Sequence, residues 1–167
     1  EGLFNQKSAF SSNEAVATAT YIGSQAAADA NPSFQLEVQT LASSQENMGL
    51  FLSDAPVALP AGTYSFDVAI NDMNYEFQFA INEEETNRDV QNRLARLINN
   101  ADIRLKASVV EDNSLTSLKI TSEATGLPNG KSRIFNISDA HTSKESGTVK
   151  YFGLDYVSHE PTNANFL

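Results

Sequence analysis

The chain has 167 residues, and its content of 41% hydrophobic and 19% charged residues is typical of a folded globular protein and excludes general disorder. Its 21 acidic and 11 basic residues give a net charge of −10, which disfavours nucleic acid and anionic membranes as partners. It has no cysteine for a disulfide or thiolate metal site, and its apolar runs fall well short of the ~20 residues of a membrane helix. Because the chain begins at Glu1, we expect a piece of a longer or processed protein.

Two strands are predicted in the N-terminal part of the chain. Small or apolar residues alternate with polar ones through "AVATATYIG", residues 15–23. After the turn residues Asn31 and Pro32, the same alternation returns in "SFQLEVQT". We expect this second strand to pair with the first and to end or bulge near Thr40, since Leu41 breaks the alternation.

The clearest alternation runs from Tyr64 to Ile81 and predicts a β-hairpin. Aromatic and aliphatic residues occupy every second position on both sides of an interruption at 71–74. A turn centred on Asp72 and Met73 would place Ile70 opposite Tyr75, Val68 opposite Phe77 and Phe66 opposite Phe79.

The next stretch, Thr86 to Asn100, has the pattern of an amphipathic helix. Its apolar residues lie at the spacing of one helical face: Val90, Leu94, Leu97 and Ile98. Thr86 and Asp89 are placed for a capping box. We interpret Glu83 to Glu85 as acidic side chains that fan outward and favour the positive end of the helix dipole.

Three further segments follow the helix. The stretch "LKASVV" and the stretch "LTSLKITS" are predicted to pair across the turn "EDNS", with Ala107 opposite Ile120 and Val109 opposite Leu118. "RIFNISD" is predicted as a strand with Phe135 and Ile137 directed inward, and "VKYFGLDYV" as a last, partly apolar segment.

These elements predict an α+β fold, mainly antiparallel hairpins in sandwich-like sheets with one principal amphipathic helix at about 86–100. We expect residues 1–55 and 140–167 to form a first lobe and 56–139 a second, or all of them to form one compact unit.

The sequence supports little enzyme chemistry. His141 and His159 are the only imidazoles, and the grouping of Asp139, His141 and Glu145 is interpreted as a solvated loop and not as a metal site. We therefore assign no catalytic residue, no metal ligand and no cofactor. Tyr151 and Tyr156, which flank Phe152 in the last apolar segment, are kept as a candidate ligand or adhesion surface.

Taken together, several stretches resemble the flagellar filament cap protein family, also called hook-associated protein 2. "SFQLEVQTLASSQ" is similar to the strand that opens that family's head domain, and "PTNANF" to an element that normally leads on to a further strand. "TNRDVQNRLARLINNADIRLKASVV" and "LKITSEATG" resemble the region of the flagellin IN motif. The motif residues would be Ile98, Asn99 and Ala101, with Ala107 and Ser108 in the strand that follows.

This resemblance implies a non-enzymatic structural protein, the outer head domain of a cap that promotes flagellin polymerisation at the filament tip. It implies export to the extracellular flagellum, with flagellin and other hook-associated proteins as partners. It also implies a self-associated ring in the full-length protein. The family's helical, polymerising terminal regions are absent from this sequence.

Two other functions remain open. The chain could be a variable outer domain of flagellin or of another hook-associated protein. It could also be a surface adhesion or carbohydrate-binding module for a host mucin or glycan, with Tyr151 or Tyr156 in contact with the ligand. An enzyme ranks third, because the sequence offers no paired catalytic groups.

Overall fold

The structure is a computed structural model that describes residues 38–142 and 144–166. The chain divides into two compact units, residues 1–42 with 163–167 and residues 43–162. In the first unit the described residues form two antiparallel strands, β1 (Val38–Thr40) and β9 (Asn165–Phe166), with an irregular register between Val38 and Thr40. The predicted irregularity near Thr40 is confirmed, whereas the predicted strand at 15–23 lies outside the described residues.

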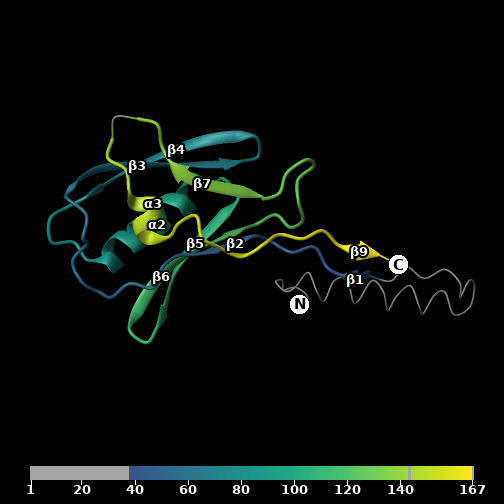
Figure 1. The fold of residues 1–167 in the computed structure, drawn as a ribbon, viewed down its shortest axis with the longest axis horizontal. Coiled ribbons are helices and arrows are strands. Elements are labelled where there is room, and N and C mark those ends of the chain that lie inside the picture. The colour runs from purple at the N-terminus through teal and green to yellow at the C-terminus, as the bar shows by residue number, and fades with distance from the viewer. Residues whose placement is uncertain (1–37, 143, 167) are drawn as a thin grey trace, which may run out of the picture. The chain divides into compact units, whose positions relative to one another are not determined.

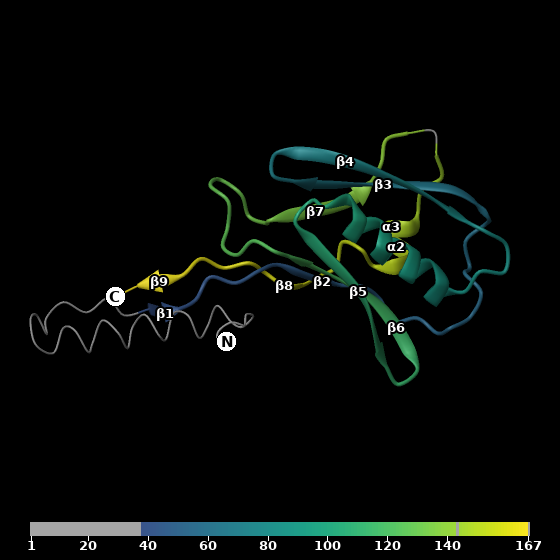
Figure 2. The same ribbon diagram turned by 180° about the vertical axis from the view of Figure 1, so that it is seen from behind.

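The described part of the second unit contains two antiparallel sheets. The first sheet has the strand order β5 (Leu105–Asp112), β6 (Leu115–Ser122), β2 (Glu46–Met48) and β8 (Val157–His159). The second has the order β4 (Met73–Ile81), β3 (Gly62–Ile70) and β7 (Phe135–Asp139). The helices α2 (Asn87–Ala101) and α3 (Thr148–Phe152) lie between the two sheets (Figures 1 and 2). The predicted α+β class with one principal helix is confirmed.

Strands from both predicted lobes share the first sheet. β2 lies in the predicted lobe of 1–55 and 140–167, yet it pairs with β6 of the predicted lobe 56–139. β8, from the C-terminal part of the chain, pairs with the other side of β2. The lobe boundaries near 55 and 140 stay a prediction.

The β3–β4 hairpin forms with a tighter turn than predicted. Its turn residues are Asn71 and Asp72, with φ of 57° and 62°, the left-handed values that a two-residue hairpin turn of type I′ requires. Asn and Asp tolerate this conformation better than most residues. The predicted turn at Asp72 and Met73 is therefore wrong.

The predicted hairpin register is wrong as well, by two residues. The observed partners are Phe66 with Phe77, Val68 with Tyr75 and Ile70 with Met73. Because a shift of two residues keeps every side chain on its face of the sheet, the apolar face is still the buried one.

Helix α2 begins and packs as the sequence predicts. The Thr86 hydroxyl accepts a hydrogen bond from the Asp89 amide (3.2 Å), and the Asp89 carboxylate accepts one from the Thr86 amide (3.1 Å), which completes the capping box. Val90, Leu94 and Ile98 are buried, and Leu97 is half-buried. The helix packs against β5 and β6 and also contacts β4.

The remaining strand predictions are largely confirmed. In the β5–β6 hairpin Ala107 pairs with Ile120 and Val109 with Leu118, as predicted. Phe135 and Ile137 of β7 are buried. The last apolar segment forms the short helix α3 and then leads into β8.

The core of the second unit lies between its sheets. Its largest fully buried side chains come from both sheets and both helices: Tyr64, Phe66, Leu94, Ile98, Leu118, Ile120, Phe135 and Phe152. Among the described residues, no helix is long and apolar enough to cross a membrane.

Candidate functional site

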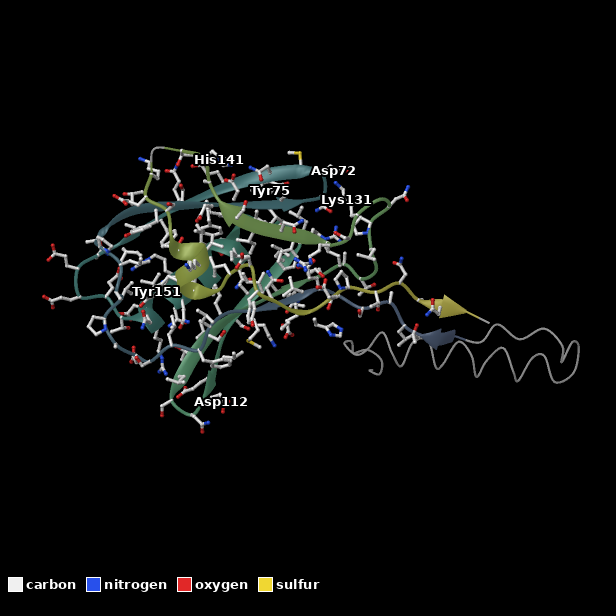
Figure 3. All side chains as sticks on the ribbon, viewed as in Figure 1. Asp72, Tyr75, Asp112, Lys131, His141 and Tyr151 are labelled. Atoms are coloured by element: carbon white, nitrogen blue, oxygen red, sulfur yellow. The ribbon has the colours of Figure 1, made fainter. Side chains whose placement is uncertain are left out.

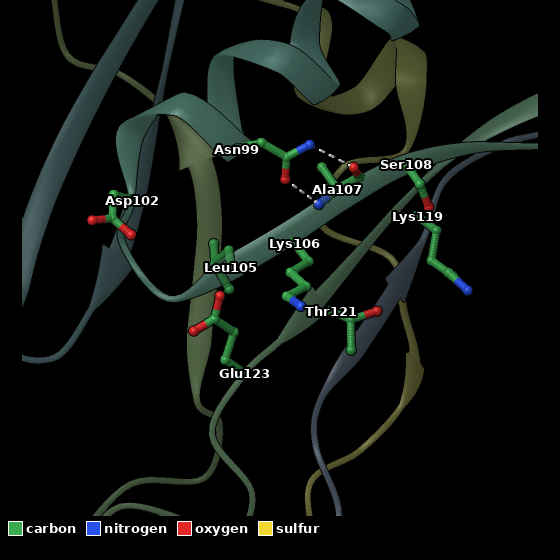
Figure 4. Close-up of a pocket in the computed structure, with 9 residues that line it drawn as sticks. All are labelled: Asn99, Asp102, Leu105, Lys106, Ala107, Ser108, Lys119, Thr121 and Glu123. Carbon is green, nitrogen blue, oxygen red and sulfur yellow. Dashed lines mark hydrogen bonds between the residues drawn. The ribbon is translucent and has the colours of Figure 1, made fainter. Parts of the chain in front are cut away.

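Three residues of the predicted IN motif, Asn99, Ala107 and Ser108, line a hollow at the C-terminal end of α2. The hollow has a volume of about 610 Å³, and its lining comes from the helix end, β5 and β6 and the residues that follow them (Figure 4). The lining residues are Asn99, Asp102, Leu105, Lys106, Ala107, Ser108, Lys119, Thr121 and Glu123.

Asn99 joins the helix to the outer edge of β5. Its side-chain Nδ2 donates a hydrogen bond to the carbonyl oxygen of Ala107 (2.8 Å), and its Oδ1 accepts one from the Ala107 amide (2.8 Å) (Figure 4). These two bonds are the pair that a residue in a neighbouring strand would form with Ala107. The Asn99 amide therefore takes the place of a strand partner on β5.

The other motif residues have separate roles. Ile98 is fully buried in the core and anchors the last turn of α2. Ala107 is buried on the inner face of β5, whereas Ala101 and Ser108 are exposed, and Ser108 lines the hollow. The structure thus brings Asn99, Ala107 and Ser108 together at the hollow and places Ile98 behind them.

The helix ends in a way that presents Asn99 to β5. Asp102 has a left-handed conformation with φ of 55°, and its amide donates to the Asn99 carbonyl (3.4 Å). Arg104, with φ of 71°, turns the chain back into β5. The backbone reversal therefore places Ala107 alongside the last turn of α2.

The chemistry of the hollow suits contact with a polar surface. Its lining includes two ammonium groups, Lys106 and Lys119, and two carboxylates, Asp102 and Glu123. Arg104 adds an ion pair to Glu123 (3.4 Å). None of the described lining residues is histidine or cysteine, so these groups can supply hydrogen bonds and charge but not an imidazole base or a thiolate.

The two tyrosines kept as a candidate surface are not in equivalent positions. Tyr151 is half-buried, and its hydroxyl donates to Asn87 Oδ1 (2.6 Å) and accepts from the Ala58 amide (3.1 Å). It therefore ties α3 to the start of α2 and to the segment before β3. Tyr156 is 65% exposed and lines a different hollow, together with Leu50. The candidate adhesion surface thus rests on Tyr156.

The acidic and histidine residues near the end of β7 are spread along a loop. His141 is exposed beyond β7 (Figure 3), the Asp139 carboxylate accepts from the Gly147 amide (3.5 Å), and the Glu145 backbone pairs with Thr63 and Ser65 of β3. Within residues 38–142 and 144–166, no group of three or more His, Cys, Asp or Glu side chains could hold a metal ion.

An ion pair at the start of α2 corrects one interpretation of the sequence. Glu85 does not fan outward, because its carboxylate accepts two hydrogen bonds from the Arg93 guanidinium and one from the Asn82 amide (2.7 Å). The Arg93 hydrogen bond lowers the pKa of Glu85 to about 2, although burial acts in the opposite direction. The same hydrogen bond raises the pKa of Arg93.

Sequence reasoning also missed Gln45, which is fully buried. Its Nε2 donates to the Phe135 carbonyl (2.9 Å), and its Oε1 accepts from the amides of Ile134 (2.7 Å) and Phe135 (3.1 Å). Gln45 thus occupies the outer edge of β7 as Asn99 occupies that of β5. A lone glutamine in a mixed stretch carries no periodic signal that could have identified it.

No family model and no curated protein matches the chain. Among solved structures, the D1-D2-D3 domains of the flagellar cap protein FliD from Escherichia coli align with 79% of this chain at 21% identity, with a TM-score of 0.51. The aligned part is 39% of the E. coli chain, so this chain spans about two fifths of its length. FliD from Bdellovibrio bacteriovorus aligns with 79% of this chain and 69% of its own at 20% identity, with a TM-score of 0.47. The chain therefore shares its fold with domains of the E. coli flagellar cap protein.

Proposed function

We propose that this chain is the outer head domain of a flagellar cap protein, a structural and non-catalytic part of an exported assembly. The observation that carries the proposal is the shared fold with domains of the E. coli flagellar cap protein. The placement of Asn99 adds support, because it gives the IN-like motif a structural role at the end of α2. On this proposal the full-length protein forms a ring at the filament tip, promotes flagellin polymerisation and contacts flagellin and other hook-associated proteins.

The mixed charges of the hollow fit an assembly surface. Lys106 and Lys119 lie beside Asp102 and Glu123, so a partner can be aligned by charge and by hydrogen bonds. The net charge of the chain is −10, so most of its surface would repel acidic neighbours. The two lysines give the hollow local positive charge, which would allow transient contacts there.

Immunogold labelling of intact cells tests the proposal. An antibody raised against this chain would be applied to the source bacterium and its position on the filaments recorded by electron microscopy. Labelling confined to filament ends is the expected result. Labelling along the whole filament would instead identify an outer domain of flagellin, and labelling at filament junctions another hook-associated protein.

A second candidate function is adhesion, and one observation favours it. Tyr156 is 65% exposed beside a hollow that Leu50 also lines, and exposed aromatic rings stack on sugars. A glycan array that includes mucin oligosaccharides tests this candidate. Binding that Tyr156→Ala abolishes and Tyr151→Phe leaves intact would favour it, whereas absence of binding would reject it.

A further inference from the structure

β4 is the outermost strand of its sheet, and the structure shows which backbone groups it turns outward. The Ser65 amide and the Thr63 carbonyl form hydrogen bonds with the Glu145 backbone, so the backbone N–H and C=O groups of the odd-numbered residues of β3 point away from β4. The even-numbered residues of β3 therefore bond to β4, and their partners there are odd-numbered. The backbone N–H and C=O groups of Asn74, Glu76, Gln78 and Ala80 point away from the sheet.

In the described part of the chain, most of this outward edge is open. Arg93 donates to the Ala80 carbonyl (2.8 Å) and closes the end of the edge near α2. The side chains of Asn74, Glu76 and Gln78 are exposed, and the stretch contains no proline. A long edge without proline or covering element is a template for pairing with another strand.

In the described structure, the other outer strands of the second unit are partly covered or short. The Asn99 side chain forms hydrogen bonds with both outward backbone groups of Ala107 on β5, its N–H and its C=O, and α2 packs against that strand. Gln45 takes those of Phe135 on β7, and α3 contacts that strand too. β8 has only three residues. Among the described strands of the second unit, β4 thus has the longest edge available for pairing.

The outer face of the β4 sheet carries an unbalanced negative charge. Asp67 of β3 lies directly opposite Glu76 of β4, and like charges in that position destabilise a sheet. Among the ion pairs of the described residues, none includes either carboxylate. The Glu76 carboxylate accepts a hydrogen bond from the neutral Gln78 amide (2.9 Å). A cationic side chain beside Glu76 would relieve this repulsion.

We propose that the edge of β4 from Asn74 to Gln78 binds an extended polypeptide segment that carries lysine or arginine at alternate positions. The backbone of the segment adds a strand to the sheet, and a cationic side chain lies beside Glu76, with Asp67 one strand further in. A second copy of this chain fits less well, because its net charge of −10 opposes self-association, its own β4 carries no lysine or arginine, and Asn99 already occupies the edge position next to Lys106 on β5. The proposal does not depend on a flagellar role.

The binding test uses the 167-residue chain and fluorescent peptides of about the length of β4, which has nine residues. One peptide alternates lysine with valine, and its matched control alternates glutamate with valine. A third has the lysine sequence with every second backbone nitrogen methylated, which removes its donors on one edge. Fluorescence anisotropy should show saturable binding of the first peptide only, and hydrogen exchange should show protection of the Glu76 and Gln78 amides.

Protein variants separate the backbone from the charge. Gln78→Pro removes an outward N–H that the β3–β4 ladder does not use, and it should weaken binding about tenfold or more, whereas Gln78→Thr keeps the N–H and should bind normally. Glu76→Gln should weaken binding roughly two- to fivefold. Asp112→Asn makes the same charge change at the tip of the β5–β6 hairpin (Figure 3) and should have no effect.

Three results would overturn the proposal. The first is no saturable binding of the lysine peptide. The second is equal binding of the methylated peptide, which tests the backbone contact on the unchanged protein even if Gln78→Pro does not fold. The third is a dimer of the chain that Gln78→Pro dissociates, because the occupant of the edge would then be a second copy.

Discussion

At the scale of single residues, the structure uses side-chain amides as substitutes for strands. A primary amide has a donor and an acceptor side by side, as a peptide group does, so Asn99 can satisfy both outward groups of Ala107. Gln45 does the same for Phe135, and its burial makes its hydrogen bonds harder for water to replace. Each of these side chains therefore occupies a position at the edge of its sheet where a further strand would otherwise bond.

We predict that Asn99→Ala lowers the free energy of unfolding by about 1–2 kcal/mol, because two part-buried backbone groups lose their partners. Hydrogen exchange at the Ala107 amide should accelerate more than exchange in β3. Asn99→Asp keeps an acceptor for the Ala107 amide but loses the donor, so an intermediate stability is expected. Unchanged exchange at Ala107 in Asn99→Ala would show that the Asn99 side chain does not protect the edge of β5.

The Glu85–Arg93 ion pair predicts a dependence of stability on pH. The pKa of Glu85 is lowered to about 2 in the folded protein, from an ordinary value of 4.5. The stabilising contribution of the Glu85 carboxylate is therefore complete above about pH 4.5 and is lost as the pH falls from there toward 2. Since the Glu85 side chain is only 16% exposed, this contribution should be on the order of 2–3 kcal/mol.

Urea unfolding at about pH 6 and about pH 3 checks this expectation. Glu85→Gln should lose less stability on acidification than the unchanged protein. Glu111→Gln is the matched control, because Glu111 pairs with Arg88 at 3.5 Å but is 58% exposed. An equal loss in the Glu85→Gln variant would contradict a stabilising role for the charged carboxylate.

At the scale of elements, α2 joins the two sheets. Its apolar face packs against β5 and β6, and its other contacts reach β4, directly and through Arg93. Because each sheet has one face toward the helices, removal of side chains from α2 should weaken both sheets at once.

We predict that Leu94→Ala lowers the free energy of unfolding by about 2–5 kcal/mol, since Leu94 is fully buried and its truncation leaves a cavity. The midpoint of urea unfolding measures the loss. Leu97→Ala makes the same chemical change on a half-buried part of the same helix and should have a smaller effect. A Leu94→Ala midpoint equal to that of the unchanged chain would contradict the assignment of Leu94 to the core.

At the scale of the whole molecule, charge opposes self-association. The chain carries −10, and Asp67 and Glu76 add local repulsion beside its open edge. If the chain acts in a ring, as proposed above, contacts between its copies would have to overcome this repulsion with help from other parts of the assembly.

We therefore expect the isolated chain to be a monomer at micromolar concentration in about 0.15 M salt. Analytical ultracentrifugation should give one species near 18.1 kDa. In about 1 M salt, which screens surface charge, weak association should increase if repulsion is what keeps the chains apart. A stable pentamer or hexamer at the lower salt concentration would contradict this expectation and show that this chain carries its own assembly contacts.

The sequence alone determined the elements whose causes are local. The capping box of Thr86 and Asp89, the apolar stripe of α2 and the β5–β6 register follow from the identity of residues only a few positions apart. The β3–β4 hairpin was also predictable in outline, but not its register, because the tight turn depends on which pair of residues accepts positive φ.

Only the tertiary structure decided which distant groups meet. The bonds between Gln45 and Phe135 span 90 positions, and the bond between Tyr151 and Asn87 spans 64, so no sequence periodicity predicts them. For the same reason the sequence could not separate the buried hydroxyl contacts of Tyr151 from the exposure of Tyr156, nor show which strand edge stays open. Such features depend on the packing of whole sheets and helices, which the local preferences of the chain restrict but do not specify.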